Sequence, residues 1–311
     1  MDYEFRIGAG ADAVVQYILD NFSPALDAVA DGIGLFVEGI RDILLWVPTP
    51  VFIAALAALA LWRTGWRFAS FTLAALLLIT FMDLWKETIE TLALIIGATA
   101  IAVTIGIPLG IVMARSRLAA LLTRPVLDLM QTMPAFVYLI PAAMFFGLGA
   151  VPGTIATVIF SMPPVVRLTA LGLTQVNREY VEAGLAFGCT DRQLLTKVQF
   201  PLALPSIMAG VNQTIMLALS MVVIASMIGA GGLGNTVLTG IQRLDVGLGF
   251  EGGLAVVVLA IILDRLTQSL SRPAALQLPR MLPSRTGSTA KPERAETETA
   301  GTGTDFVRAG T

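Results

Sequence analysis

The chain has 311 residues, of which 56% are hydrophobic and only 14% are charged. Soluble domains carry about 25% charged residues, so this composition, with a mean hydropathy of +0.79, excludes a soluble enzyme, a disordered protein and a nucleic-acid binder. The absence of histidine and the presence of one cysteine, Cys189, exclude an internal disulfide and the commonest catalytic base and metal ligand. Ten charged residues lie in 1–42 and ten in 272–311, so a long apolar region separates two polar ends.

The first 42 residues are predicted to form an external N-terminal region that contains an amphipathic helix. Apolar side chains recur there at spacings of three and four, which is the pattern of a helix with one apolar face. They are Phe22, Leu26, Val29, Ile33, Phe36, Ile40 and Leu44. We expect this helix to lie on the outer membrane surface, although its polar face is acidic and not rich in Lys and Arg.

The apolar region predicts an all-α integral membrane protein with about seven transmembrane helices. A helix needs about 20 largely apolar residues to cross the hydrocarbon, and the runs without charge supply candidates. Residues 43–82 hold two accessory spans, at 43–62 and 68–82. Residues 85–270 form the core, with spans expected at 91–114, at about 204–228 and at about 251–270. The run 129–166 is predicted to hold two more spans, separated by a glycine-rich turn, and the second of these runs on past Arg167.

The basic residues predict how the chain is oriented, because Lys and Arg in short loops mark the cytoplasmic side. They gather after the first, third, fifth and seventh spans. These residues are Arg63, Arg67, Arg115, Arg117, Arg124, Arg178, Arg192, Lys197, Arg272, Arg280 and Arg285. The N-terminus is therefore predicted outside and the C-terminus in the cytoplasm. Residues 271–311 are rich in Pro, Gly, Ser and Thr and are expected to be a disordered cytoplasmic tail.

The loop between the fifth and sixth spans is the most polar part of the core. Asn177 can cap a first helix, and Gly188 can supply the left-handed residue at its end. Thr190 and Gln193 have the spacing of a capping box for a second helix, which we expect Pro201 to end. Composition alone is also compatible with an ordinary solvated helical hairpin.

The spacing within this loop, residues 177–201, resembles the EAA loop of binding-protein-dependent ABC importer permeases. That pattern is E-A-A, three residues, G, nine residues and then I-x-L-P. The corresponding residues here are Glu182, Ala183, Gly184, Gly188, Val198, Phe200 and Pro201. Three residues depart from the pattern while its spacing is kept, since Gly184 stands for the second Ala, Val198 for Ile and Phe200 for Leu.

The resemblance implies that this loop is a coupling helix that docks on a separate ATPase subunit. Glu182 would make a polar contact to the ATPase, and Gly188 would form the tight turn. Ala183 and Gly184 would allow close packing, and Arg192 is assigned to the same docking surface. The three lysines of the chain are not in a G-x-x-x-x-G-K-[ST] motif, so ATP and magnesium are expected on the partner ATPase, with no cofactor or metal on this chain.

A wider resemblance covers residues 85–270, which look like the permease subunits of glycine betaine/proline betaine importers. The matching segments are 129–141, 162–169 and 207–227. The resemblance implies a type I ABC importer permease core that catalyses no reaction itself. Its implied partners are the cytoplasmic ATPase, a periplasmic or lipid-anchored substrate-binding protein, membrane lipid and a second copy of this chain.

Two alternatives concern what is transported and what drives transport. The cargo could be choline, carnitine or another small solute. A secondary transporter coupled to ions is disfavoured, because such proteins place ionisable residues within their spans, and these spans are almost free of charge.

Some polar and glycine residues of the sixth span and the following segment have no assigned role in transport. Gly229 to Gly234 match G-x-G-x-x-G, but the motif follows a membrane helix and not a strand, so we interpret it as a turn and packing element. Polar side chains within the span could line a pathway or join helices. They are Asn212, Gln213, Ser220 and Ser226. The sequence does not identify the substrate-binding residues, which are therefore unknown.

Overall fold

The computed structural model describes residues 7–271, and this part of the chain is helical, without a strand. The predicted tail lies outside the described residues, apart from Ser271. The elements in chain order are α1 (Ile7–Trp46), α2 (Thr49–Arg63), α3 (Trp66–Phe81), α4 (Trp85–Arg115), α5 (Arg117–Thr132), α6 (Ala135–Phe146), α7 (Ala150–Thr174), α8 (Arg178–Ala186), α9 (Asp191–Gln193), the π-helix η1 (Leu194–Gln199), α10 (Phe200–Ser226), α11 (Gly232–Arg243) and α12 (Val246–Ser271). The all-α prediction is confirmed.

Four helices of the described part are long and apolar enough to cross a membrane. They are Trp85–Arg115, Ala150–Thr174, Asp191–Ser226 and Val246–Ser269. Two further pairs of helices pass the same test when each bent pair is taken as one span, which raises the number to six. The second predicted span, 68–82, corresponds to α3, whose 16 residues extend about 24 Å, less than the hydrocarbon thickness of about 30 Å.

Two predicted spans are not continuous helices, which corrects the sequence interpretation of 43–62 and of the first half of 129–166. The chain bends by 97° between Val15–Trp46 and Thr49–Arg63, and by 101° between α5 and α6. Pro48 and Pro134 lie at these breaks in extended conformations. A proline disfavours helical geometry in the residue before it, so a run of apolar residues without charge does not guarantee one straight helix.

A tyrosine of α6 forms a hydrogen bond across the bend between α5 and α6. The hydroxyl of Tyr138 donates to the main-chain oxygen of Met130 at 2.8 Å, near the end of α5. The last carbonyls of a helix have no partner within it. Tyr138 supplies one at this bend, which helps to fix the angle between the two helices.

The predicted amphipathic helix is confirmed as part of a longer helix, α1. Its second half packs on the core, where Val37 is buried against Gly97 of α4, and Gly34 adjoins Val151 of α7. Phe22 and Phe36, two members of the predicted apolar face, are exposed. The position of α1 on a membrane surface stays a prediction.

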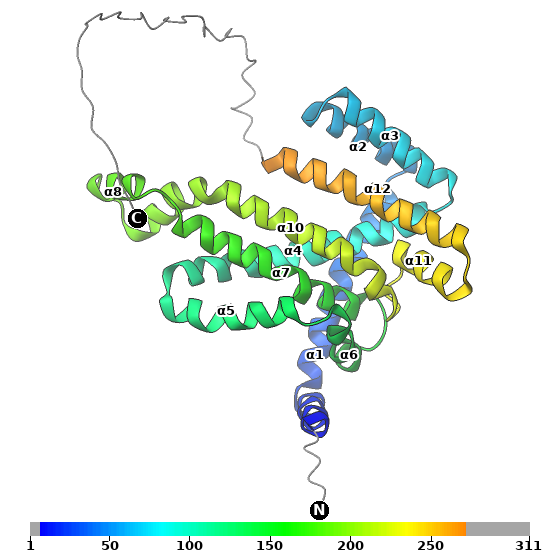
Figure 1. Cartoon of the computed structure of the whole chain (residues 1–311), viewed down its shortest axis with the longest axis horizontal. Helices are drawn as coiled ribbons and strands as arrows, with labels where there is room; N and C mark the ends of the chain where they lie inside the picture. The colour runs from blue at the N-terminus through cyan, green and yellow to red at the C-terminus, as the bar shows by residue number, and fades with distance from the viewer. Residues whose placement is uncertain (1–6, 272–311) are drawn as a thin grey trace, which may run out of the picture. The chain divides into compact units, whose positions relative to one another are not determined.

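Helix α7 packs against both α4 and α10 (Figure 1), and glycines at these contacts bring the backbones close together. A Cβ atom at Gly110 of α4 would lie 2.7 Å from the main-chain oxygen of Val166. At Gly210 of α10, a Cβ atom would lie 2.9 Å from Cα of Val165. Small residues of this kind allow membrane helices to pack by direct backbone contact.

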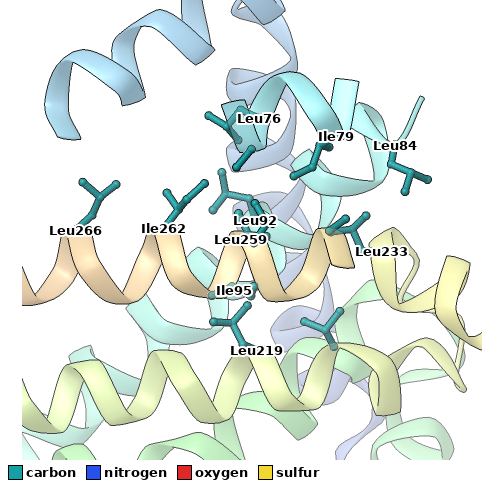
Figure 2. Packing of buried hydrophobic residues seen from close by; sticks show 14 of the residues in the cluster. Leu76, Ile79, Leu84, Leu92, Ile95, Leu219, Leu233, Leu259, Ile262 and Leu266 are labelled. Atoms are coloured by element: carbon teal, nitrogen blue, oxygen red, sulfur yellow. The ribbon is translucent and has the colours of Figure 1, made fainter. Parts of the chain in front are cut away.

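A large apolar cluster joins the accessory helix α3 to the core, as Figure 2 shows. Its members come from α2, α3, α4, α10, α11 and α12, with Leu84 just before α4. Those labelled in the figure include Leu76, Ile79, Leu92, Ile95, Leu219, Leu233, Leu259, Ile262 and Leu266. Dispersion and burial in this cluster hold α3 beside α12.

The segment of Gly229 to Gly234 is confirmed as a turn and packing element. Gly229 and Gly231 have φ angles of 84° and 79°, which favour glycine. The amide of Gly149 donates to the oxygen of Ile228 at 2.8 Å, so the start of α7 is tied to this turn. The segment then begins α11, a 12-residue helix, which the sequence interpretation of a turn did not include.

The close approach at Gly210 predicts a steric penalty for any side chain there. We expect Gly210→Ala to lower the melting temperature of the purified protein in detergent, with a cost of about 1–3 kcal/mol typical of overpacking. Gly253→Ala is the matched control, because a Cβ atom at this α12 glycine meets nothing within 4 Å. Equal melting temperatures for the two variants would contradict the packing argument.

Candidate coupling hairpin

Residues 177–199 form a helical hairpin whose first helix, α8, is capped as the sequence predicted. The side chain of Asn177 accepts a hydrogen bond from the amide of Glu179 at 3.1 Å. At the other end, Gly188 has a φ of 78°, and the amide of Cys189 donates to the oxygen of Gly184 at 3.0 Å. This left-handed closure satisfies carbonyls at the end of α8 and reverses the chain.

The second arm of the hairpin begins at the predicted capping box. The amide of Gln193 donates to Oγ1 of Thr190 at 3.4 Å, and the amide of Thr190 donates to Oε1 of Gln193 at 2.9 Å. These reciprocal bonds fix the start of α9. The predicted order of helix, glycine turn and second helix is therefore confirmed.

Pro201 does not end the second arm, and the prediction that it would is wrong. The arm continues through η1 into α10, so that Asp191–Ser226 is one helix of 36 residues. A proline ring clashes with the carbonyl four residues before it in a regular α-helix. The π-helical turn, in which the amide of Phe200 donates to the oxygen of Leu195, widens the backbone just before Pro201 and accommodates the ring.

The two arms of the hairpin meet at Gly184. This glycine is buried, and a Cβ atom there would lie 2.9 Å from Cδ1 of Leu194 and 3.5 Å from Cγ2 of Val198. The absence of a side chain lets α8 pack directly on the second arm. Val198 and Phe200 are half-buried, and Phe200 packs against a cluster around Leu173, Ala203 and Ile207.

The other sequence-assigned residues are exposed, on the hairpin or, for Pro201, at the start of α10. They are Glu182, Ala183, Gly188, Arg192 and Pro201. The structure therefore separates the assigned set into an outer group, which a partner could contact, and an inner group, which holds the two arms together.

An exposed apolar group on α8 and its turn was missed by the sequence analysis. Phe187 is 91% exposed, and Tyr180 and Leu185 are also exposed. These apolar side chains stand in the most polar loop of the core, and that contrast is the sequence signal that could have indicated an exposed apolar surface. Large aromatic side chains of this kind are typical anchors of protein interfaces.

Some polar groups in the described spans are paired with other helices, whereas the buried hydroxyls of Thr72, Thr99, Ser161, Thr169 and Thr214 have no hydrogen-bond partner. Nδ2 of Asn212 donates to Oδ1 of Asp264 at 3.0 Å, and Nε2 of Gln268 donates to the same oxygen at 2.7 Å. Arg167 of α7 forms an ion pair with Asp128 of α5. Within residues 7–271 there is no group of three or more His, Cys, Asp or Glu that could hold a metal ion.

Comparison with known proteins places the chain in a family. Residues 106–274 match the family described as "Binding-protein-dependent transport system inner membrane component". The glycine betaine/proline betaine transport system permease protein ProW of Escherichia coli is 50% identical over 83% of this chain and 73% of its own length. The glycine betaine/carnitine transport permease protein GbuB of Listeria monocytogenes is 50% identical over 82% of this chain and 92% of its own.

A solved structure shows the same fold. An inward-facing form of the MetNI methionine ABC transporter superposes with a TM-score of 0.53 at 24% identity, covering 62% of this chain and 94% of that one. The chain belongs to the family of binding-protein-dependent transport system inner membrane components. It is therefore a multi-pass inner-membrane permease of an ABC importer, as the EAA-like spacing indicated.

Proposed function

We propose that this chain is the permease subunit of an ATP-driven importer of quaternary-ammonium compatible solutes, with glycine betaine and proline betaine as cargo. The observation that carries the proposal is the 50% identity, over most of this chain, to a permease named for those two solutes. Carnitine is the second candidate cargo, because a relative of equal identity is named for glycine betaine and carnitine.

In this proposal, the hairpin of residues 177–199 receives the force of a separate cytoplasmic ATPase, which holds ATP and magnesium. The exposed Glu182, Arg192 and Phe187 form the docking surface. The continuous helix Asp191–Ser226 carries movement of the hairpin into the membrane. A periplasmic or lipid-anchored binding protein delivers the solute, and two copies of the chain form the pathway between them.

The proposed function is tested by uptake of labelled glycine betaine in cells that lack their own osmolyte importers. The cells express this chain with its ATPase and binding protein, and each component is omitted in turn. We expect uptake only when all three are present. Uptake that persists without the ATPase and collapses with a protonophore would show a secondary transporter, whereas ATPase binding without betaine uptake would redirect the search to carnitine or choline.

The role of Phe187 in docking is tested by Phe187→Ala. Because the side chain is 91% exposed, its removal is expected to leave the melting temperature unchanged. We expect co-purification of the ATPase to fall by about ten-fold, as for a moderate interface anchor. Phe81→Ala is the control, since Phe81 is 86% exposed at the end of α3, which the predicted topology places outside. Unchanged ATPase binding by Phe187→Ala would contradict the docking assignment.

The proposed orientation is tested by labelling Cys189, the single cysteine of the chain, which lies in the hairpin. A membrane-impermeant maleimide is expected to label it in inside-out vesicles and not in spheroplasts. For the opposite side, Leu148→Cys in a Cys189→Ser background introduces a thiol at the α6–α7 turn, where Leu148 is 79% exposed. This variant is expected to react in spheroplasts. The reverse pattern would invert the topology.

A further inference from the structure

One hydrogen bond links the inner end of α4 to the hairpin. Arg115, the last residue of α4, donates from Nη2 to the main-chain oxygen of Asp191 at 2.9 Å. Asp191 is the first residue of α9 and lies 76 positions further along the chain. Within residues 7–271, no other hydrogen bond or ion pair joins α4 to residues 177–199. The donor is charged, which makes this kind of bond stronger than one between neutral groups.

Apolar packing brings the same two elements together but leaves space between them. Ile111 and Ala114 of α4 pack on the same buried cluster as Leu195 of the hairpin. Beside this cluster lies a cavity of about 270 Å³, lined by the ends of α4 and α7 and by the hairpin. Its lining includes Ala114, Arg115, Thr174, Arg178 and Gln199. Side chains that border a cavity are not held by close packing, so the hairpin has room to tilt against α4.

At its other end, α4 holds the turn that follows α10. Oε2 of Glu90 accepts from the amide of Gly232 at 3.1 Å, and Oγ1 of Thr91 accepts from the amide of Leu233 at 2.8 Å. Movement of α4 therefore reaches the start of α11. Movement of the continuous helix reaches the same region through the covalent chain.

We propose that Arg115 is a positioning residue that transmits movement of the hairpin to α4, so that α4 and the helix Asp191–Ser226 move as one unit. Without this bond, the hairpin reaches α4 only through apolar contacts, and the cavity absorbs part of the displacement between the hairpin and the end of α4. The inference rests on the proposed function, because it takes the hairpin to be the element that the ATPase moves.

The test is hydrogen exchange measured by mass spectrometry on the permease–ATPase complex in nanodiscs, without nucleotide and trapped with ATP and vanadate. In the wild-type complex, we expect nucleotide to change exchange both in the hairpin and in the last turns of α4. In Arg115→Ala, the response of the hairpin is expected to persist, and that of α4 to fall about five-fold, the size expected for loss of one solvent-exposed hydrogen bond. No solute is needed for this measurement.

Two variants separate transmission from a general structural defect. Arg117→Ala is the matched control, because Arg117 is exposed, lies two residues further on and makes no hydrogen bond or ion pair within the described part of the chain. It is expected to behave as wild type. Arg115→Lys keeps a charged donor and is expected to restore part of the α4 response. Where uptake is measured, Arg115→Ala is expected to lower the solute transported per ATP hydrolysed.

Each outcome of this experiment decides something. An α4 response in Arg115→Ala equal to that of wild type overturns the inference. A wild-type complex in which the hairpin responds and α4 does not overturns it as well, and leaves the proposed function standing. A hairpin that does not respond to nucleotide in the wild-type complex overturns both.

Discussion

The continuity of the helix Asp191–Ser226 through Pro201 is the constraint on which the rest of the structure depends. A proline inside a helix ordinarily breaks it or kinks it, and a break here would separate the hairpin from the membrane part of the chain. The π-helical turn before Pro201 removes the clash while keeping the backbone helical. The result is one rod of about 54 Å, which begins at the capping box of Thr190 and ends at the glycine turn beside Gly149.

Close glycine contacts join α7 to this helix and to α4, so in the proposed mechanism α7 is the neighbour that carries its movement to the other spans. Gly210 brings α10 against the backbone of Val165, and Gly110 brings α4 against that of Val166. Surfaces in direct backbone contact leave little freedom for side chains to rearrange, so displacement of one helix is passed to the next. The inner end, around the cavity beside Arg115, is packed less closely. At that end, a hydrogen bond such as that of Arg115 to Asp191 contributes more to the connection between helices than close packing does.

The sequence predicted best the features that depend on local chemistry. The cap at Asn177 and the turn at Gly188 follow from short-range hydrogen bonding and backbone preference, and both are present. It predicted less well the features set by the backbone over longer distances. The bend at Pro134 was hidden because the run around it carries no charge, and the helix through Pro201 was missed because it depends on the π-helical turn before it. Exposure of Phe187 depends on how the two arms pack, which spacing alone does not reveal.

The paired charges bear on the source of energy for transport. Asp264 accepts from Asn212 and Gln268, and Asp128 is paired with Arg167, so these carboxylates join helices. A carboxylate that binds a coupling ion has to exchange it during each cycle, and Asp264 would first have to give up two protein partners. These hydrogen bonds need not break if the energy for transport is applied to a part of the chain outside the spans. The hairpin, with the exposed side chains that we propose as a docking surface and its continuous helix through Pro201, offers that entry.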